Sequence, residues 1–148
     1  MTGWTLNQAW PSPDFWVHLG AVREFASAPL SPANPMVTGH AADPYMSPYT
    51  FLLGVLVGAL GVDAVTVLAV AGVISLVLLL YALHRFVRSV SLEPSAPAFA
   101  LAFTLTAWGW NPWRWSGFFD LNSLGAVLPL ASTSASALGL IAIVGSRT

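Results

Sequence analysis

A run of twenty residues without a charge extends from Ala64 to Leu83 and is rich in Val and Leu. It is followed directly by His84 and Arg85, and then by Arg88. Twenty helical residues at a rise of about 1.5 Å each cover the roughly 30 Å hydrocarbon core of a bilayer. The pattern therefore predicts a transmembrane helix over residues 64–83.

Two further apolar stretches follow, at residues 96–111 and 124–144. The first is short for a span and fits a bilayer if the helix tilts or the membrane thins locally. The second carries four hydroxyl residues between Ser132 and Ser136, and small residues of this kind usually mark close helix contacts, so we expect them to face protein. The fold class predicted is an all-α integral membrane protein with about three transmembrane helices.

A first short helix is indicated ahead of these spans. Ser12-Pro13-Asp14 is a typical helix start, with Ser as N-cap, Pro at the first position and an acid in the first turn. Apolar residues then recur at helical spacing, at Phe15, Leu19, Val22 and Ala26. Asp14 and His18 lie one turn apart on another face. This pattern predicts an amphipathic helix on the outer membrane interface.

A second short helix is indicated by Ser47-Pro48, which opens an apolar run that ends at Gly61. It is too short to span a bilayer, so we expect an interfacial or re-entrant helix. Residues 1–62 are thus predicted to be an extracytoplasmic segment with two interfacial helices, and residues 63–148 to hold the transmembrane helices.

Composition agrees with a membrane protein, because 56% of the residues are hydrophobic and only 7% are charged. The chain has no Cys, which excludes disulfide and thiol chemistry. A formal net charge of −1 without a basic run excludes an electrostatic nucleic-acid interface.

Orientation follows from the Arg residues that flank the first span, because positive charge is retained in the cytoplasm. Arg85 and Arg88 place the loop 84–95 inside, and the long N-terminal segment and the loop 111–123 outside. All seven Trp then fall on the outer side, where Trp favours the membrane interface. We expect a multi-pass protein of the cell membrane.

The N-terminal segment must then cross the membrane, although residues 1–10 lack the charged start, apolar core and cleavage site of a signal peptide. Two interpretations stay open. Either the first span translocates a short N-terminal tail, or the chain is a piece of a longer polytopic protein whose first helix is missing.

Candidate chemistry is confined to a few polar residues on the predicted outer side, because the chain has no phosphate-binding glycine loop, His-x-x-x-His spacing or nucleophile elbow. Asp14 and His18 could form a base and its orienting partner, or a helix-start acid and an interfacial His. His40 and Asp43 could bind a substrate or ion, or form a solvated turn. Arg114, among aromatic residues of the loop 111–123, suits a phosphate, although an interfacial aromatic belt explains its neighbours equally well.

The order of motifs resembles the GT-C class of multi-pass glycosyltransferases, which take sugars from polyprenyl-phosphate donors on the outer membrane face. The residues that carry the resemblance are Asp14-Phe-Trp-Val-His18-Leu, a Pro/Asn-rich stretch, and Ser47-Pro-Tyr-Thr leading into a short helix before a span. In that class a catalytic acid lies near the start of the first outer loop, and Asp14 stands at that place. Several members carry an acidic pair in the next outer loop, where this chain has Asp120-Leu121-Asn122.

The resemblance implies that Asp14 is the general base, and that the donor and acceptor are bound by residues from the outer segments. Those residues are His18, Arg23, His40, Asp43, Arg114 and Asp120. One acid of the outer pair is an amide here, which argues against a divalent metal, and we expect no cofactor. The expected partners are the bilayer, a polyprenyl-phosphate sugar, and either the missing remainder of a larger protein or other membrane subunits.

A second interpretation is a non-catalytic subunit of a larger membrane complex. His18 or His84 would then ligate a pigment or haem, since imidazole is a common axial ligand. A buried His within a span would favour this interpretation, and the position of His84 at a helix end beside Arg85 fits it poorly.

Overall fold

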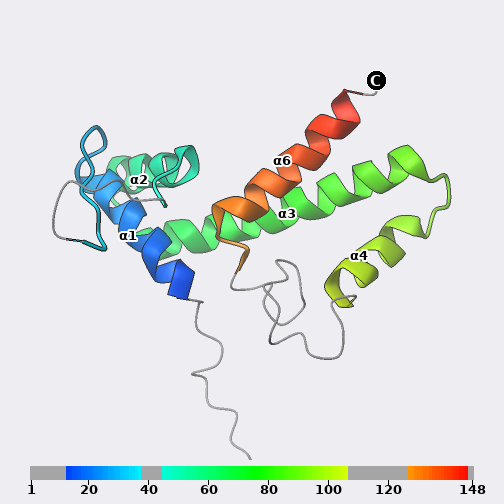
Figure 1. Ribbon diagram of the computed structural model, residues 1–148, viewed down its shortest axis with the longest axis horizontal. Coiled ribbons are helices and arrows are strands. Elements are labelled where there is room, and N and C mark those ends of the chain that lie inside the picture. Colours follow the sequence, from blue (N-terminus) through cyan, green and yellow to red (C-terminus); the bar gives the residue numbers. More distant parts are fainter. Residues whose placement is uncertain (1–12, 38–44, 107–126, 147–148) are drawn as a thin grey trace, which may run out of the picture. The chain divides into compact units, whose positions relative to one another are not determined.

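The computed structural model describes residues 13–37, 45–106 and 127–146, with the side chains of Pro13 and Asp14 left out (Figure 1). These residues form five helices and no strand, which confirms the all-helical prediction for this part of the chain. The helices are α1 (Pro13–Ser27), α2 (Pro48–Leu60), α3 (Ala64–Val90), α4 (Ala96–Thr106) and α6 (Ala131–Gly145). The chain divides into two compact units at Leu68 and Ala69, and each unit is described by itself.

In the first unit, α2 begins and ends where the sequence predicts. The backbone N–H of Thr50 donates to Ser47 Oγ at 3.2 Å, and the backbone N–H of Ser47 donates to Thr50 Oγ1 at 2.9 Å. This reciprocal pair is a capping box, with Pro48 at the first helical position. At the other end Gly61 adopts a left-handed conformation (φ 65°) and its N–H donates to Val57 O at 2.9 Å.

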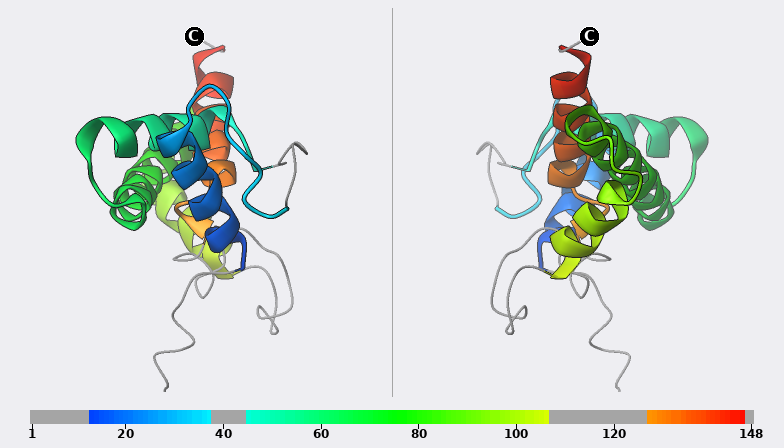
Figure 2. Two further views of the ribbon diagram at one scale, coloured as in Figure 1. Left: turned by 90° about the vertical axis from the view of Figure 1, so that its left-hand side faces the viewer. Right: turned by 90° about the vertical axis from the view of Figure 1, so that its right-hand side faces the viewer.

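Helices α1 and α2 lie side by side because two glycines of α2 face α1 (Figures 1 and 2). A Cβ atom on Gly54 would collide with Phe25 Cβ and would lie 2.8 Å from Val22 O. A Cβ atom on Gly58 would lie 3.2 Å from Ala26 O. Glycines four residues apart thus let the two helix backbones come close together.

Helix α3 starts at Ala64, as predicted, and continues to Val90, seven residues beyond the end of the predicted span. Its start is capped by Asp63, whose Oδ2 accepts from Val65 N at 2.9 Å. Its last turn carries Arg88, whose Nη1 donates to the carbonyl oxygens of Leu92 (2.9 Å) and Glu93 (3.2 Å). A positive charge in the last turn of a helix interacts favourably with the helix dipole. Arg88 is therefore compatible with a helix that continues to Val90.

Among the described residues, α3 is the one helix long and apolar enough to cross a membrane by length and composition. Helices α2, α4 and α6 are apolar but shorter. The predicted spans 96–111 and 124–144 both run into residues that the structure does not describe.

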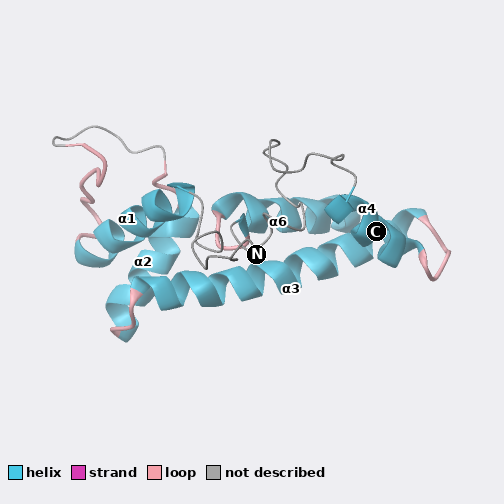
Figure 3. Cartoon of the chain, turned by 90° about the horizontal axis from the view of Figure 1, so that it is seen from below, coloured by secondary structure: helices cyan, strands magenta, loops and turns pink. Residues whose placement is uncertain are grey.

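In the second unit, α6 runs alongside α3 (Figures 1 and 3). Leu79 and Ala82 of α3 form a buried cluster with Ala137 of α6. The two helices also share a hydrogen bond, because the hydroxyls of Ser75 and Ser134 lie 2.8 Å apart. Small side chains at this contact allow the close approach that the hydroxyl pattern predicts.

The prediction that the hydroxyl residues face protein is confirmed for Thr133 and Ser134 and is wrong for Ser132. Thr133 is fully buried and donates from Oγ1 to Val127 O at 2.7 Å, and Ser134 bonds to Ser75. Ser132 is exposed. Ser136 is also exposed, but it borders a space that leucines of α3 and α4 line as well, and its hydroxyl donates to Ser132 O at 2.8 Å. Hydroxyl residues at positions 132, 133, 134 and 136 cannot all share one face, since adjacent residues are separated by about 100° around the helix axis.

This difference between neighbouring serines predicts unequal effects of the same substitution. Ser134→Ala removes the hydrogen bond to Ser75 and should lower the free energy of unfolding in mild detergent by about 0.6–1.5 kcal/mol. Ser132→Ala, on the exposed side of the same helix, is the matched control and should change it little. Equal effects of the two variants in thermal unfolding followed by circular dichroism would mean that the Ser75–Ser134 contact does not hold α6 on α3.

Candidate functional site

The structure places only part of the predicted site. Asp14 is the second residue of α1, and its backbone position alone is described. His18 and Arg23 lie on the same helix with their side chains described. The other predicted site residues lie outside the described residues: His40, Asp43, Arg114 and Asp120.

His18 is buried, with only 9% of its surface exposed, whereas the sequence pattern placed it on a polar face. That placement was wrong. The reason lies in the spacing, because His18 is three residues after Phe15 and four before Val22, and both of these are buried. Its ring packs edge-to-face against Tyr45, with the ring centroids 5.2 Å apart and an interplanar angle of 82°.

Tyr45 joins His18 to the start of α2. The hydroxyl of Thr50, which is fully buried, donates to Tyr45 O at 3.0 Å. Thr50 is also the residue that closes the capping box with Ser47. A ring contact and a buried hydroxyl therefore fix the position of His18 relative to the first turn of α2.

Arg23 is exposed, and the structure does not bring it to His18. Five residues separate the two along α1, which corresponds to a rotation of roughly 140° around the helix axis. Its neighbour Glu24 holds the segment that follows the helix, because its Oε2 accepts from Ala33 N at 3.3 Å. That segment also folds back on α1 further along, where Pro35 lies against Gly20.

Asp14 shares a side of α1 with His18, since residues four apart are separated by only about 40° around the axis. It also stands in the first turn, where the unpaired backbone N–H groups and the helix dipole favour an anion. The arrangement thus combines an acid in the first turn of α1 with an imidazole held one turn later. A carboxylate so placed can accept a proton from a hydroxyl that binds beside it.

No group of three or more His, Cys, Asp or Glu side chains in the described ranges is close enough to hold a metal ion. His84 is exposed near the end of α3, next to Arg85, and His18 is packed against Tyr45.

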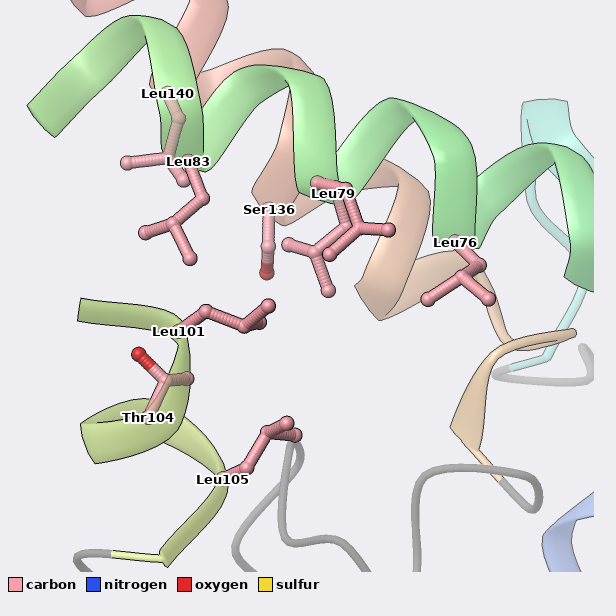
Figure 4. A pocket seen from close by; sticks show the side chains of 9 residues that line it. Leu76, Leu79, Leu83, Leu101, Thr104, Leu105, Ser136 and Leu140 are labelled. Carbon is pink, nitrogen blue, oxygen red and sulfur yellow. The ribbon is translucent and has the colours of Figure 1, made fainter. Parts of the chain in front are cut away.

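The second unit holds an apolar cavity of about 360 Å³ that the sequence analysis did not predict (Figure 4). Leucines of α3 line one side, and α4 and α6 supply the remainder, including the hydroxyl residues Thr104 and Ser136. The leucines of α3 recur at helical spacing, at Leu76, Leu79, Leu80 and Leu83. That spacing is the sequence signal that could have indicated the lined face.

In comparisons with known proteins, no family model, no curated protein and no solved structure matches the chain.

Proposed function

We propose that the chain is an integral membrane protein in which α3 crosses the bilayer. The observation that carries this proposal is the exposure of apolar side chains along α3. Only 28% of the most apolar 18-residue segment of α3 is buried by the rest of the chain. The side chains of Val73 and Val77 in this helix are 62% and 61% exposed. A core helix of a soluble protein is covered by its own chain, whereas a spanning helix is covered by lipid.

We further propose that this protein is part of a membrane glycosyltransferase that uses a polyprenyl-phosphate sugar on the outer face of the cell membrane. The support is the order and packing of elements. Two short helices, α1 and α2, pack together directly ahead of α3, and Asp14 stands in the first turn of the first. This is the arrangement on which the resemblance to the GT-C class rests.

In this proposal Asp14 removes the proton of the acceptor hydroxyl as that oxygen bonds to the anomeric carbon of the sugar. The bond from this carbon to the lipid phosphate breaks, and the phosphate leaves with the electron pair. His18, whose ring packs against Tyr45, is proposed to border the place where the acceptor binds. Arg114, with Arg23 and His40, supplies positive charge to the departing phosphate.

The assay for this function uses the purified chain, with any subunits that copurify, in proteoliposomes. A panel of polyprenyl-phosphate sugars carrying a radiolabel in the sugar is supplied with acceptor glycans. The proposal expects protein-dependent release of label from the lipid to a water-soluble acceptor. Absence of transfer from every donor would contradict it and favour a non-catalytic subunit of a larger complex.

A further inference from the structure

Helix α2 presents an apolar face that the other described residues of its unit leave largely exposed, apart from Phe51 at its edge, whose ring packs edge-to-face against Phe25 of α1. Its exposed large side chains follow one side of the helix, at Phe51, Leu52, Val55, Leu56 and Leu60. These positions repeat with the period of an α-helix, so they form a single stripe. No charged residue occurs between Pro48 and Val62.

The opposite side of α2 is closed by α1. Thr50 and Leu53 are buried there, and Gly54 and Gly58 lie against the backbone of α1. The charged residues of the described part of this unit are found elsewhere, at Asp14, Arg23 and Glu24 on α1 and at Asp63 after α2. Charge and apolar surface are thus segregated between the two helices.

Several backbone groups at the ends of α2 are bonded within the chain itself. The capping box of Ser47 and Thr50 occupies donors at the start, and Gly61 N–H bonds to Val57 O at the end. A helix whose terminal groups have internal partners can enter a lipid environment without leaving those groups exposed to hydrocarbon.

The connection to α3 limits where α2 can lie. Only Gly61, Val62 and Asp63 separate the two helices. Leu60 and Ala64 are four residues apart, so the end of α2 stays within about 14 Å of the point where α3 begins. With α3 in the bilayer, the apolar face of α2 therefore lies within reach of lipid.

We infer that α2 lies in the plane of the membrane interface, with its apolar face inserted into the acyl chains and α1 held on the water side through Gly54 and Gly58. At 13 residues, or about 20 Å, the helix is too short to cross the bilayer. This inference rests on the proposed insertion of α3. The occupant of the face is bilayer lipid, because an uncharged face next to a spanning helix matches the interior of the membrane in polarity.

The test uses the full chain in liposomes and exploits its lack of Cys. An environment-sensitive fluorophore is attached to Leu56→Cys on the apolar face, to Leu52→Cys as a second position, and to Ser27→Cys on the exposed side of α1 as the matched control. Quenching is measured with lipids that carry a nitroxide near the headgroup end of the acyl chain, and separately with aqueous iodide. Val77→Cys on α3 serves as the reference for insertion of that helix.

A label on α2 should lie roughly 5–10 Å below the headgroup boundary, so nitroxide lipids should reduce its emission about twofold and iodide should quench it little. The label on Ser27→Cys should show the reverse. Quenching of Leu56→Cys and Leu52→Cys by iodide, with Val77→Cys quenched by nitroxide lipids, would overturn this inference alone. Protection of the α2 labels from both quenchers would mean that protein covers the face, and a Val77→Cys label not quenched by lipid would overturn the membrane proposal as well.

Discussion

Replacing Asp14 by Asn is expected to abolish sugar transfer in the reconstituted protein while leaving its fold and membrane insertion intact. Asn has the shape of Asp and keeps an oxygen acceptor at the start of α1, but it cannot take a proton from the acceptor hydroxyl. Loss of a general base lowers the rate of the chemical step by about 10²–10⁴-fold. The measurement is turnover of the polyprenyl-phosphate sugar, with donor binding determined separately.

Glu24→Gln is the matched control, since it neutralises another acid of α1. Gln keeps an oxygen that can accept from Ala33 N, the bond that Glu24 makes to the segment after the helix. Turnover by Glu24→Gln should stay close to that of the wild type. If Asp14→Asn also kept wild-type turnover, Asp14 would not be the base, whereas equal losses in the two variants would point to an effect of charge on α1 as a whole.

Gly54→Ala is expected to separate α1 from α2, because among the described glycines an added Cβ would meet its nearest atom most closely at Gly54. The added Cβ would overlap Phe25 Cβ and lie 2.8 Å from the carbonyl oxygen of Val22, and a backbone carbonyl cannot rotate away as a side chain can. Overpacking of this kind costs about 1–3 kcal/mol. Hydrogen exchange should therefore become faster in both α1 and α2, and thermal unfolding should occur at lower temperature.

Gly139→Ala supplies the control, because a Cβ at Gly139 of α6 meets no atom of the described chain within 4 Å. The same change there should be neutral or should raise stability by about 0.5–1 kcal/mol, since Ala favours helix more than Gly does. Similar exchange rates in α2 of Gly54→Ala and Gly139→Ala would contradict the close contact between α1 and α2.

The sequence allowed the start and end of α2 and the start of α3 to be predicted, because those boundaries depend on local chemistry. Ser47 and Pro48 specify a helix start, Gly61 a left-handed end, and Asp63 caps the next helix. The predicted span ends at Leu83, where apolar residues give way to charged ones, and the helix that contains this segment is longer than the span. Polarity marks the edge of the bilayer, whereas the hydrogen-bonded backbone continues as far as Val90.

The candidate site was harder to predict, since it depends on contacts between segments. The burial of His18 requires the ring of Tyr45, which lies 27 residues later in the chain. Gly54 and Gly58 stand one turn apart in the sequence, but nothing in α2 itself indicates that α1 is their partner. Periodicity finds the apolar face of a single helix, and it does not identify what covers that face.

Labelling of single Cys residues on the two sides of α3 tests the central claim, that this helix crosses the membrane, most directly. Ser31→Cys precedes α3 and Ser89→Cys lies in its last turn, and both positions are exposed. In intact cells that make the protein, an impermeant maleimide should label Ser31→Cys at once and Ser89→Cys only after the membrane is permeabilised. Labelling of Ser89→Cys alone would reverse the predicted orientation, and equal labelling of both positions in intact cells would contradict a membrane-spanning α3.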